Sequence, residues 1–330
     1  RFACLLLCCS MMLAASRLAL GVSKSRTGVL GMMGKRGFSS TRMVWAAEAA
    51  ETTDQTKKRN DCKVLVVTSG KGGVGKTTTA ASIGMGLAKH GHKTCVIDFD
   101  VGLRNLDIHY GMERRIIYDF VNCIHEECTL RQALVKDKRN DNLFMLAASQ
   151  TKDKTALKDE GVERVLNELK DNDFKYIVCD SPAGIESGAY QAMLYADVAF
   201  ICTNPELSSV RDSDKMIGFI SSKSKRALDN RDPVEQLLII TRYNPERVQN
   251  DDMLSKEDIQ DTLSLPIIGI IPDSNEVLNS INVGKPVILG EGPAAGAYDD
   301  LVRRFLGEKQ LPFRFLDVPQ KGFFQRLFNR

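Results

Sequence analysis

The chain runs from Lys63-Val64-Leu65-Val66-Val67-Thr68 through Ser69 into Gly70-Lys71-Gly72-Gly73-Val74-Gly75-Lys76-Thr77, and Thr77–Lys89 then has the pattern of an amphipathic helix. A strand, a glycine-rich turn and a helix in this order predict a phosphate-binding loop, because glycine lets backbone N–H groups curl around a phosphate at a helix N-terminus. In such a loop Lys76 lies between the β- and γ-phosphates, and the Thr77 hydroxyl coordinates Mg²⁺. The predicted nucleotide-binding residues of the loop are Gly70, Lys71, Gly72, Gly73, Val74, Gly75, Lys76, Thr77 and Thr78.

Apolar runs and helical patterns alternate along residues 62–308 at the spacing of a parallel sheet. The helical stretches include Thr77–Lys89, Gly161–Lys170 and a helix opened by the capping box Ser255-x-x-Asp258. We therefore expect one α/β domain, a doubly wound and mostly parallel sheet with helices on both faces. The predicted strands are Lys63–Thr68, Thr94–Phe99, Leu143–Ala147, Tyr176–Cys179, Val198–Thr203, Leu237–Thr241 and Ile267–Ile271.

Charge is unevenly distributed along the 330 residues. The formal net charge is +3, but residues 1–47 contain seven Lys and Arg and no acidic residue, which leaves about −4 for residues 48–330. A mildly acidic body disfavours broad electrostatic binding to DNA, and no nucleic-acid partner is expected. No apolar run reaches the roughly 18 residues of a membrane-spanning helix.

Residues 1–47 have the composition of an organelle-targeting peptide, because they are basic, contain Ser and lack acids. The polar stretch 48–61 is expected to be a linker. Arg36-Gly37-Phe38-Ser39-Ser40 resembles a mitochondrial cleavage site, whereas the apolar stretch Phe2–Ala15 would suit the first part of a plastid leader. We expect a peripheral protein on an inner organelle membrane, facing matrix or stroma, with the mitochondrion favoured over the plastid.

Nine cysteines occur in the chain, three of them in the leader. Cys95, Cys179 and Cys202 lie in predicted strands, where Cys packs as a small apolar side chain. Cys123 and Cys128 are the only near neighbours in the body, and we expect them to fill helix or loop positions. The pattern suits a reducing compartment rather than a disulfide framework.

Three aspartates end predicted strands, at the edge where an open α/β sheet binds its ligand. Asp180 closes Tyr176–Cys179, which is typical of a Walker B aspartate in a Mg²⁺ shell, although a helix N-cap is the alternative. Asp98 and Asp100 close another strand, where a carboxylate can accept from an attacking water or organise Mg²⁺, and a structural turn is the alternative. The predicted metal site consists of Thr77, Asp98 and Asp180.

Residues 321–330 form a basic amphipathic pattern that follows an expected linker over 309–320. Such a helix lies in the interface of an anionic membrane. A helix this short binds weakly alone, so two of them on one dimer would act together. A helix docked on its own domain is the alternative. The expected membrane-contacting residues are Lys321, Phe323, Phe324, Arg326, Leu327 and Phe328.

The run GKGGVGKTT resembles the deviant Walker A motif of the MinD/ParA/NifH family of ATPases, because a second lysine, Lys71, directly follows the first glycine. Other segments from about residue 62 onward resemble the MinD branch of that family: VIDFDVGLRNLDI, RRIIYDFVN, ASQTKDK, VCDSPAGIESGA, TNPELSSVRDSDK, TRYNP and KGFFQRLF. The resemblance implies a Mg²⁺-dependent ATP hydrolase that dimerises on ATP, binds membrane and helps to place the division site of an organelle. A ParA-like partition ATPase and an Fe–S carrier or reductase ATPase of the same superfamily are the alternatives.

The resemblance also implies catalytic roles. Lys71 would reach across the dimer interface to the partner's nucleotide, and Lys76 would act on the phosphates of its own loop. Asp100 would position the hydrolytic water, with Asp98 supporting the metal site.

Two further groups of residues follow from the resemblance. Those expected against the nucleotide base are Arg242, Asn244, Pro272 and Asp273, which would equally suit turns after strands. Asp212 and Asp214, at the charged start of a helix, are expected in the surface that binds MinE-like and MinC-like regulators. A solvated helix face is the alternative for these two.

Overall fold

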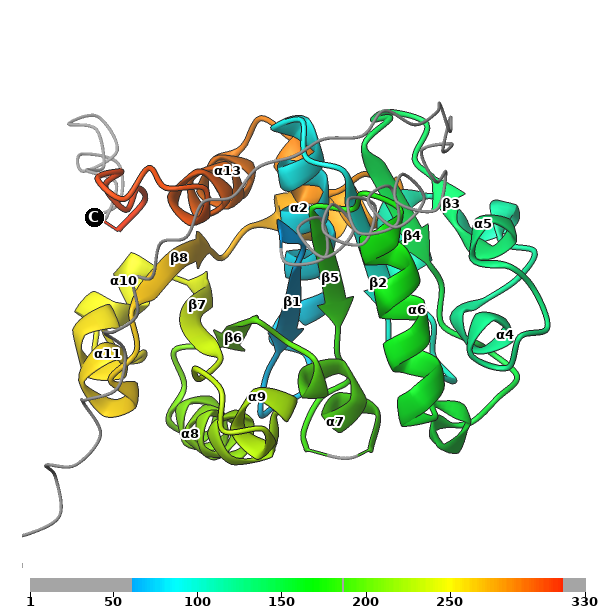
Figure 1. Ribbon diagram of the computed structural model, residues 1–330. Helices are drawn as coiled ribbons and strands as arrows, with labels where there is room; N and C mark the ends of the chain where they lie inside the picture. The colour runs from blue at the N-terminus through cyan, green and yellow to red at the C-terminus, as the bar shows by residue number, and fades with distance from the viewer. Residues whose placement is uncertain (1–60, 186, 317–330) are drawn as a thin grey trace, which may run out of the picture. The chain divides into compact units, whose positions relative to one another are not determined.

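The computed structural model describes residues 61–185 and 187–316, which build an eight-stranded sheet (Figure 1). The strands are β1 (Lys63–Thr68), β2 (Thr94–Asp98), β3 (Val135–Lys136), β4 (Leu143–Leu146), β5 (Tyr176–Asp180), β6 (Val198–Thr203), β7 (Glu235–Tyr243) and β8 (Ile267–Pro272). Their order is β3-β4-β2-β5-β1-β6-β7-β8. Neighbouring strands are parallel except for β3 and β4, which pair antiparallel at one edge.

The described helices surround this sheet. They are α2 (Lys76–Lys89), α3 (Leu106–Tyr110), α4 (Phe120–Ile124), α5 (Leu130–Ala133), α6 (Asp159–Asp171), α7 (Ser187–Leu194), α8 (Leu207–Lys223), α9 (Lys225–Leu228), α10 (Pro245–Gln249), α11 (Lys256–Leu263), α12 (Asn275–Asn282) and α13 (Pro293–Phe305). Three 3₁₀ turns accompany them: η1 (Glu113–Arg115), η2 (Lys154–Ala156) and η3 (Val287–Leu289).

Helices cover both faces of the sheet, which confirms the doubly wound fold (Figure 1). Successive side chains of a strand point to opposite faces. In β1, Val64 and Val66 join a core with residues of α6, α7 and α8, whereas Leu65 and Val67 join a second core with residues of α2 and α13. Because both faces of β1 are buried, its sequence is a continuous apolar run instead of an alternating one.

All seven predicted strands are present, with ends that differ from the predicted ones by at most two residues. The strand β3 was not predicted, because a strand of two residues is too short to leave a periodic pattern in the sequence. The predicted capping box is confirmed: Ser255 Oγ accepts from the Asp258 N–H at 3.1 Å, and Asp258 Oδ2 accepts from the Ser255 N–H at 3.1 Å.

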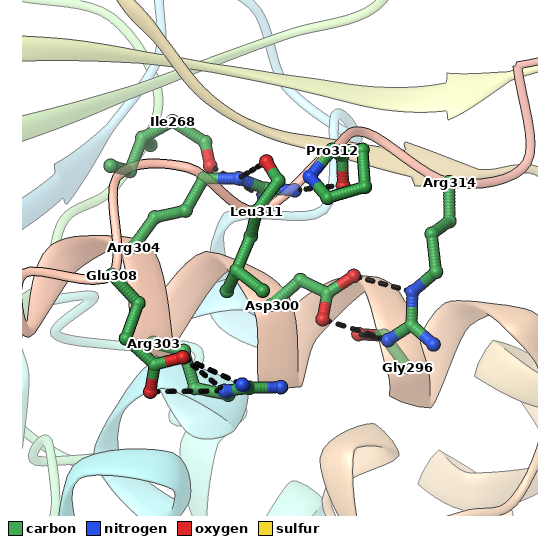
Figure 2. Close-up of polar contacts among 9 residues, drawn as sticks. All are labelled: Ile268, Gly296, Asp300, Arg303, Arg304, Glu308, Leu311, Pro312 and Arg314. Carbon is green, nitrogen blue, oxygen red and sulfur yellow. Dashed lines mark hydrogen bonds and ion pairs between the residues drawn. The ribbon is translucent and has the colours of Figure 1, made fainter.

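Two arginines hold the segment after α13 against the body (Figure 2). Arg314 forms a bidentate ion pair with Asp300 of α13, at 2.6 and 2.8 Å. Arg304 is buried and donates hydrogen bonds to the main-chain carbonyls of Ile268 at 3.2 Å, Leu311 at 3.1 Å and Pro312 at 2.7 Å. The chain beyond α13 is therefore fixed on that helix and on the edge strand β8 as far as Arg314.

The predicted leader 1–47 lies outside the described residues, as do the predicted linker 48–61 apart from its last residue and the predicted helix 321–330. None of the helices in the described ranges is both long enough and apolar enough to cross a membrane.

Candidate nucleotide site

The phosphate loop joins β1 to α2 at the carboxyl edge of the sheet. Gly75 is the N-cap of α2 and has a φ of 91°, in the left-handed region that favours glycine. Gly70 is required for a different reason, since a Cβ at this position would lie 2.2 Å from the main-chain oxygen of Asp212 in α8. The turn leaves the N-terminus of α2 available for an anion.

A cavity of about 980 Å³ lies over this loop. Residues 72–78 form part of its wall, and Asp100 and residues that follow β7 and β8 contribute to the rest. Its size falls within the range of pockets that enclose small ligands.

Lys76 extends within the loop and is only 8% exposed. Its Nζ donates to Ser69 Oγ at 2.9 Å, and Ser69 Oγ in turn donates to the main-chain oxygen of Lys71 at 2.6 Å. Burial lowers the pKa of Lys76, and the nearby carboxylates of Asp180 and Asp100 oppose that shift. Bound phosphates would act in the same direction as those carboxylates and favour the charged ammonium.

Asp180 ends β5 and is buried beside the loop. The Thr77 side chain hydrogen-bonds its carboxyl group, but Asp180 Oδ1 has no hydrogen-bond partner within the part of the chain that the structure describes. Burial raises the pKa of Asp180 well above its usual value, and the charge of Asp98 adds to the rise.

A hydroxyl beside a buried carboxylate oxygen that lacks a partner fits Mg²⁺, which prefers oxygen ligands. Thr77 and Asp180 could hold this ion, with substrate phosphates and water completing its shell. Over residues 61–185 and 187–316, no group of three or more His, Cys, Asp and Glu side chains is placed to hold a metal.

Asp98 lies next to Asp180 across the pair β2–β5, and it organises the loop that carries Asp100. Asp98 Oδ1 accepts from the N–H of Asp100 at 2.9 Å, and Oδ2 accepts from the N–H groups of Asn105 and Leu106 at 3.2 Å each. Burial raises the pKa of Asp98 to about 7. Asp100 lines the cavity. The predicted roles of Asp98 at the metal and of Asp100 with the attacking water are compatible with these positions and remain predictions.

Lys71 contacts the start of α8. Its Nζ lies 2.9 Å from Glu206 Oε2 and 3.1 Å from Ser208 Oγ. Neither Lys71 nor Gly70 is among the described residues that line the cavity. Within one chain, then, Lys71 is directed to α8 and not to the phosphate site of its own loop.

Three of the four residues predicted at the base line the cavity: Arg242, Pro272 and Asp273. Asn244 is not among the described residues of this wall. Its side chain accepts from the Arg247 N–H at 3.2 Å and caps α10, and its contact with the base remains a prediction. Arg247 itself does line the cavity.

The two candidate partner-binding residues occupy different environments on α8. Asp212 is half-buried, its main chain packs on Gly70, and its side chain lies 3.2 Å from Lys215 Nζ. Asp214 is exposed. Their contact with a regulator remains a prediction.

Thr241 and His109 are two of the cavity-lining residues that were not predicted from the sequence. Thr241 Oγ1 donates to the main-chain oxygen of Val74 at 2.7 Å and so supports the phosphate loop from β7. Thr241 ends a predicted strand, as the aspartates do, and that position could have revealed it. His109 of α3 also lines the cavity, and no motif indicated it.

Comparison with known proteins assigns the family. The profile of the CobQ/CobB/MinD/ParA nucleotide binding domain matches residues 65–287. The septum site-determining protein MinD of Escherichia coli K12 is 57% identical over 268 residues, which cover 81% of this chain and 99% of that protein.

Solved structures agree with this assignment. A chain of the MinC:MinD cell division protein complex from Aquifex aeolicus is 41% identical with a TM-score of 0.67, covering 79% of this chain and 98% of its own. The cell division ATPase MinD of Pyrococcus furiosus is 25% identical with a TM-score of 0.64, covering 74% of this chain and 98% of its own. With the phosphate loop and its acidic strand ends, these matches show that the chain belongs to the MinD septum site-determining ATPases of the MinD/ParA family.

Proposed function

We propose that this chain is a Mg²⁺-dependent ATP hydrolase that helps to place the division site of an organelle. One observation carries the enzymatic part: Lys76, Thr77 and Asp100 line a single cavity, and Thr77 also hydrogen-bonds the buried Asp180. Lys76 and the N-terminus of α2 would bind the β- and γ-phosphates, and Asp100 would hold the attacking water. When bound, Mg²⁺ would neutralise charge on the phosphates.

ATP would close a homodimer in which each Lys71 serves the nucleotide of the partner. The support is the placement of Lys71 at α8, outside the wall of its own cavity. Because Lys71 and Glu206 are both substantially exposed, their ion pair is weak and can be exchanged. MinE-like and MinC-like proteins would bind near Asp212 and Asp214, which lie on the same helix that Lys71 contacts.

Residues 321–330 would bind an anionic membrane surface as a pair of amphipathic tips, so that ATP binding and membrane binding are linked. The acid-free leader supports an organelle, and its Arg36-Gly37-Phe38-Ser39-Ser40 motif supports the matrix face of a mitochondrial inner membrane.

The test is co-sedimentation of the purified protein with vesicles of phosphatidylglycerol and phosphatidylcholine, with ATP, with ADP and without nucleotide. We expect sedimentation with ATP only, and weaker binding at high salt or with phosphatidylcholine alone, because basic residues contribute roughly 1 kcal/mol each near an anionic surface. Phe324→Glu should abolish sedimentation but leave nucleotide binding intact. Equal sedimentation with and without nucleotide, or an unaffected Phe324→Glu protein, contradicts the membrane part.

A further inference from the structure

His109 lies on α3, lines the nucleotide cavity and is 8% exposed. Both of its ring nitrogens have partners. Nδ1 is 3.0 Å from the main-chain oxygen of Asn105, and Nε2 is 3.2 Å from Thr78 Oγ1. The ring therefore connects the loop that follows β2 to the first turn of α2.

The chemistry of these partners determines where the protons are. A main-chain carbonyl can only accept, so Nδ1 of His109 carries a proton that it donates to Asn105. In the neutral ring Nε2 has only a lone pair, and the Thr78 hydroxyl must donate to it. The hydroxyl proton of Thr78 is then directed to His109 and is not available to a ligand in the cavity.

Protonation of His109 reverses the second hydrogen bond. In the imidazolium form both nitrogens donate, so Thr78 Oγ1 accepts from Nε2 and its own proton is free to turn elsewhere. Thr78 follows Thr77 in the first turn of α2 and lines the cavity at the end of the helix that favours anions.

Charged side chains lie near His109 on α3 and line the same cavity from several elements, among them Glu206 before α8, Arg242 of β7, Arg247 of α10 and Asp273 after β8. On α3, Asp107 favours the protonated ring, but Asp107 also lies 2.8 Å from Arg104. Lys76 of α2 and Asp100 of the preceding loop line the same cavity.

The side chains that α12 contributes to the cavity carry no ionisable group within the described residues: Asn275, Val277, Leu278 and Ile281. Burial lowers the pKa of His109, and the hydrogen bond to Asn105 opposes that shift. The ring of the free protein is therefore neutral near pH 7.

We propose that His109 is a positioning residue that couples binding of the nucleotide's phosphates to uptake of one proton, by releasing the Thr78 hydroxyl from the ring to donate to a phosphate oxygen. The proposal rests on the nucleotide binding proposed above. Phosphate charge near the ring raises the pKa of His109 in the complex. The affinity for nucleotide should then rise as the pH falls. The rise takes place between two pKa values of His109, the higher one of the complex and the lower one of the free protein.

The test is isothermal titration calorimetry with ADP and Mg²⁺ between about pH 8 and about pH 5.5, in buffers of different ionisation enthalpy, which reports the protons taken up. The variant is His109→Gln, which can keep a hydrogen bond to Thr78 but cannot titrate. His90→Gln is the matched control, since His90 is exposed at the far end of α2. ADP also changes its ionisation in this pH range, but that contribution is the same for the wild type, His109→Gln and His90→Gln and cancels when they are compared.

Relative to His109→Gln, the wild type should gain about tenfold in affinity over that range and should take up additional protons on binding. His90→Gln should match the wild type. Thr78→Val removes the hydroxyl that hydrogen-bonds the ring, so it should reduce the gain in ADP affinity at low pH. This variant provides the test if His109→Gln does not fold.

Identical pH profiles for wild type and His109→Gln, with normal binding, overturn the role of His109 alone. A wild type that does not bind ADP at any pH overturns the proposed nucleotide function instead.

Discussion

The ammonium group of Lys71 lies 2.9 Å from the carboxylate of Glu206, the residue that precedes α8. Both side chains are well exposed, 40% for Lys71 and 53% for Glu206, so solvent screens the pair and little stability depends on it. The contact that holds Lys71 in the single chain is therefore weak. A more strongly charged group, such as the phosphates of a nucleotide bound to a second subunit, could replace Glu206 as its partner.

We expect Lys71→Ala to lose ATP-dependent dimerisation while retaining nucleotide binding, since Lys76 and the main chain of the loop remain. Size-exclusion chromatography with light scattering, with and without ATP, measures the dimer. Lys89→Ala is the matched control, because Lys89 is a surface lysine of α2 with its own ion pair to Asp299 at 3.6 Å. A Lys71→Ala protein that still dimerises would show that Lys71 is only a surface charge of the loop.

Asp100→Ala should bind ATP and dimerise but hydrolyse slowly, because the group expected to hold the attacking water is removed. Losses of this kind are typically about 10²–10⁴-fold in turnover. Phosphate release under single-turnover conditions measures the step, and Asp141→Ala, a 92% exposed position, is the control. Near-normal turnover of Asp100→Ala would place the catalytic function on another residue.

The buried carboxyl groups of Asp98 and Asp180 predict a specific pH dependence of stability in metal-free protein. Burial raises both pKa values, to about 7 for Asp98, so the native state binds more protons than the unfolded chain. The free energy of unfolding contributed by these groups is therefore greatest at low pH and falls as the pH rises from about 4 to about 7.

Asp180→Asn should reduce that fall, because one of the two carboxyl groups with a raised pKa is removed. Urea denaturation in the presence of EDTA across this range provides the measurement. Asp141→Asn should not reduce it, because the pKa of Asp141 is lowered by its hydrogen bond with Lys136. A fall of the same size in wild type and Asp180→Asn would contradict the assignment.

Neighbouring arginines of α13 should differ in their effect on stability. Arg304→Met should lower the free energy of unfolding by about 1–3 kcal/mol, because the buried, charged guanidinium no longer donates to the carbonyls of Ile268, Leu311 and Pro312. Arg303→Met should have a smaller effect, since the Arg303 side chain is 35% exposed and its ion pair with Glu308 is screened by solvent. Thermal and urea unfolding compare the two, and equal effects would show that the hydrogen bonds of Arg304 contribute nothing specific.

The sequence alone predicted those site residues whose place follows from the order of strands, loops and helices along the chain. A loop between a strand and a helix must lie at the carboxyl edge of a parallel sheet, and so must aspartates that close strands, which is why Lys76, Asp100 and Asp180 could be placed together. The helix-capping residues of α11 were found for a similar reason, since the capping box is local in sequence.

Contacts between distant segments were not predictable in this way. Asn244 and Arg242 both follow the predicted strand Leu237–Thr241, but only the structure shows that the Asn244 side chain caps α10. His109 reaches Thr78 because α3 packs on α2, and nothing in the spacing of 31 residues between them indicates that contact. The position of β3 likewise depends on its pairing with β4 and not on its own two residues.

The arginine contacts beyond α13 also limit the reach of whatever follows them. Arg314 is fixed to Asp300, and the described chain ends two residues later at Leu316. Seven residue steps separate the anchored Arg314 from Lys321, and even a fully extended chain of that length spans only about 24 Å. If residues 321–330 bind lipid as proposed, the side of the domain that carries Asp300 must approach within roughly that distance of the bilayer. A membrane-bound subunit would then have a restricted set of orientations. Regulators could bind only the surfaces of the domain that face away from the lipid.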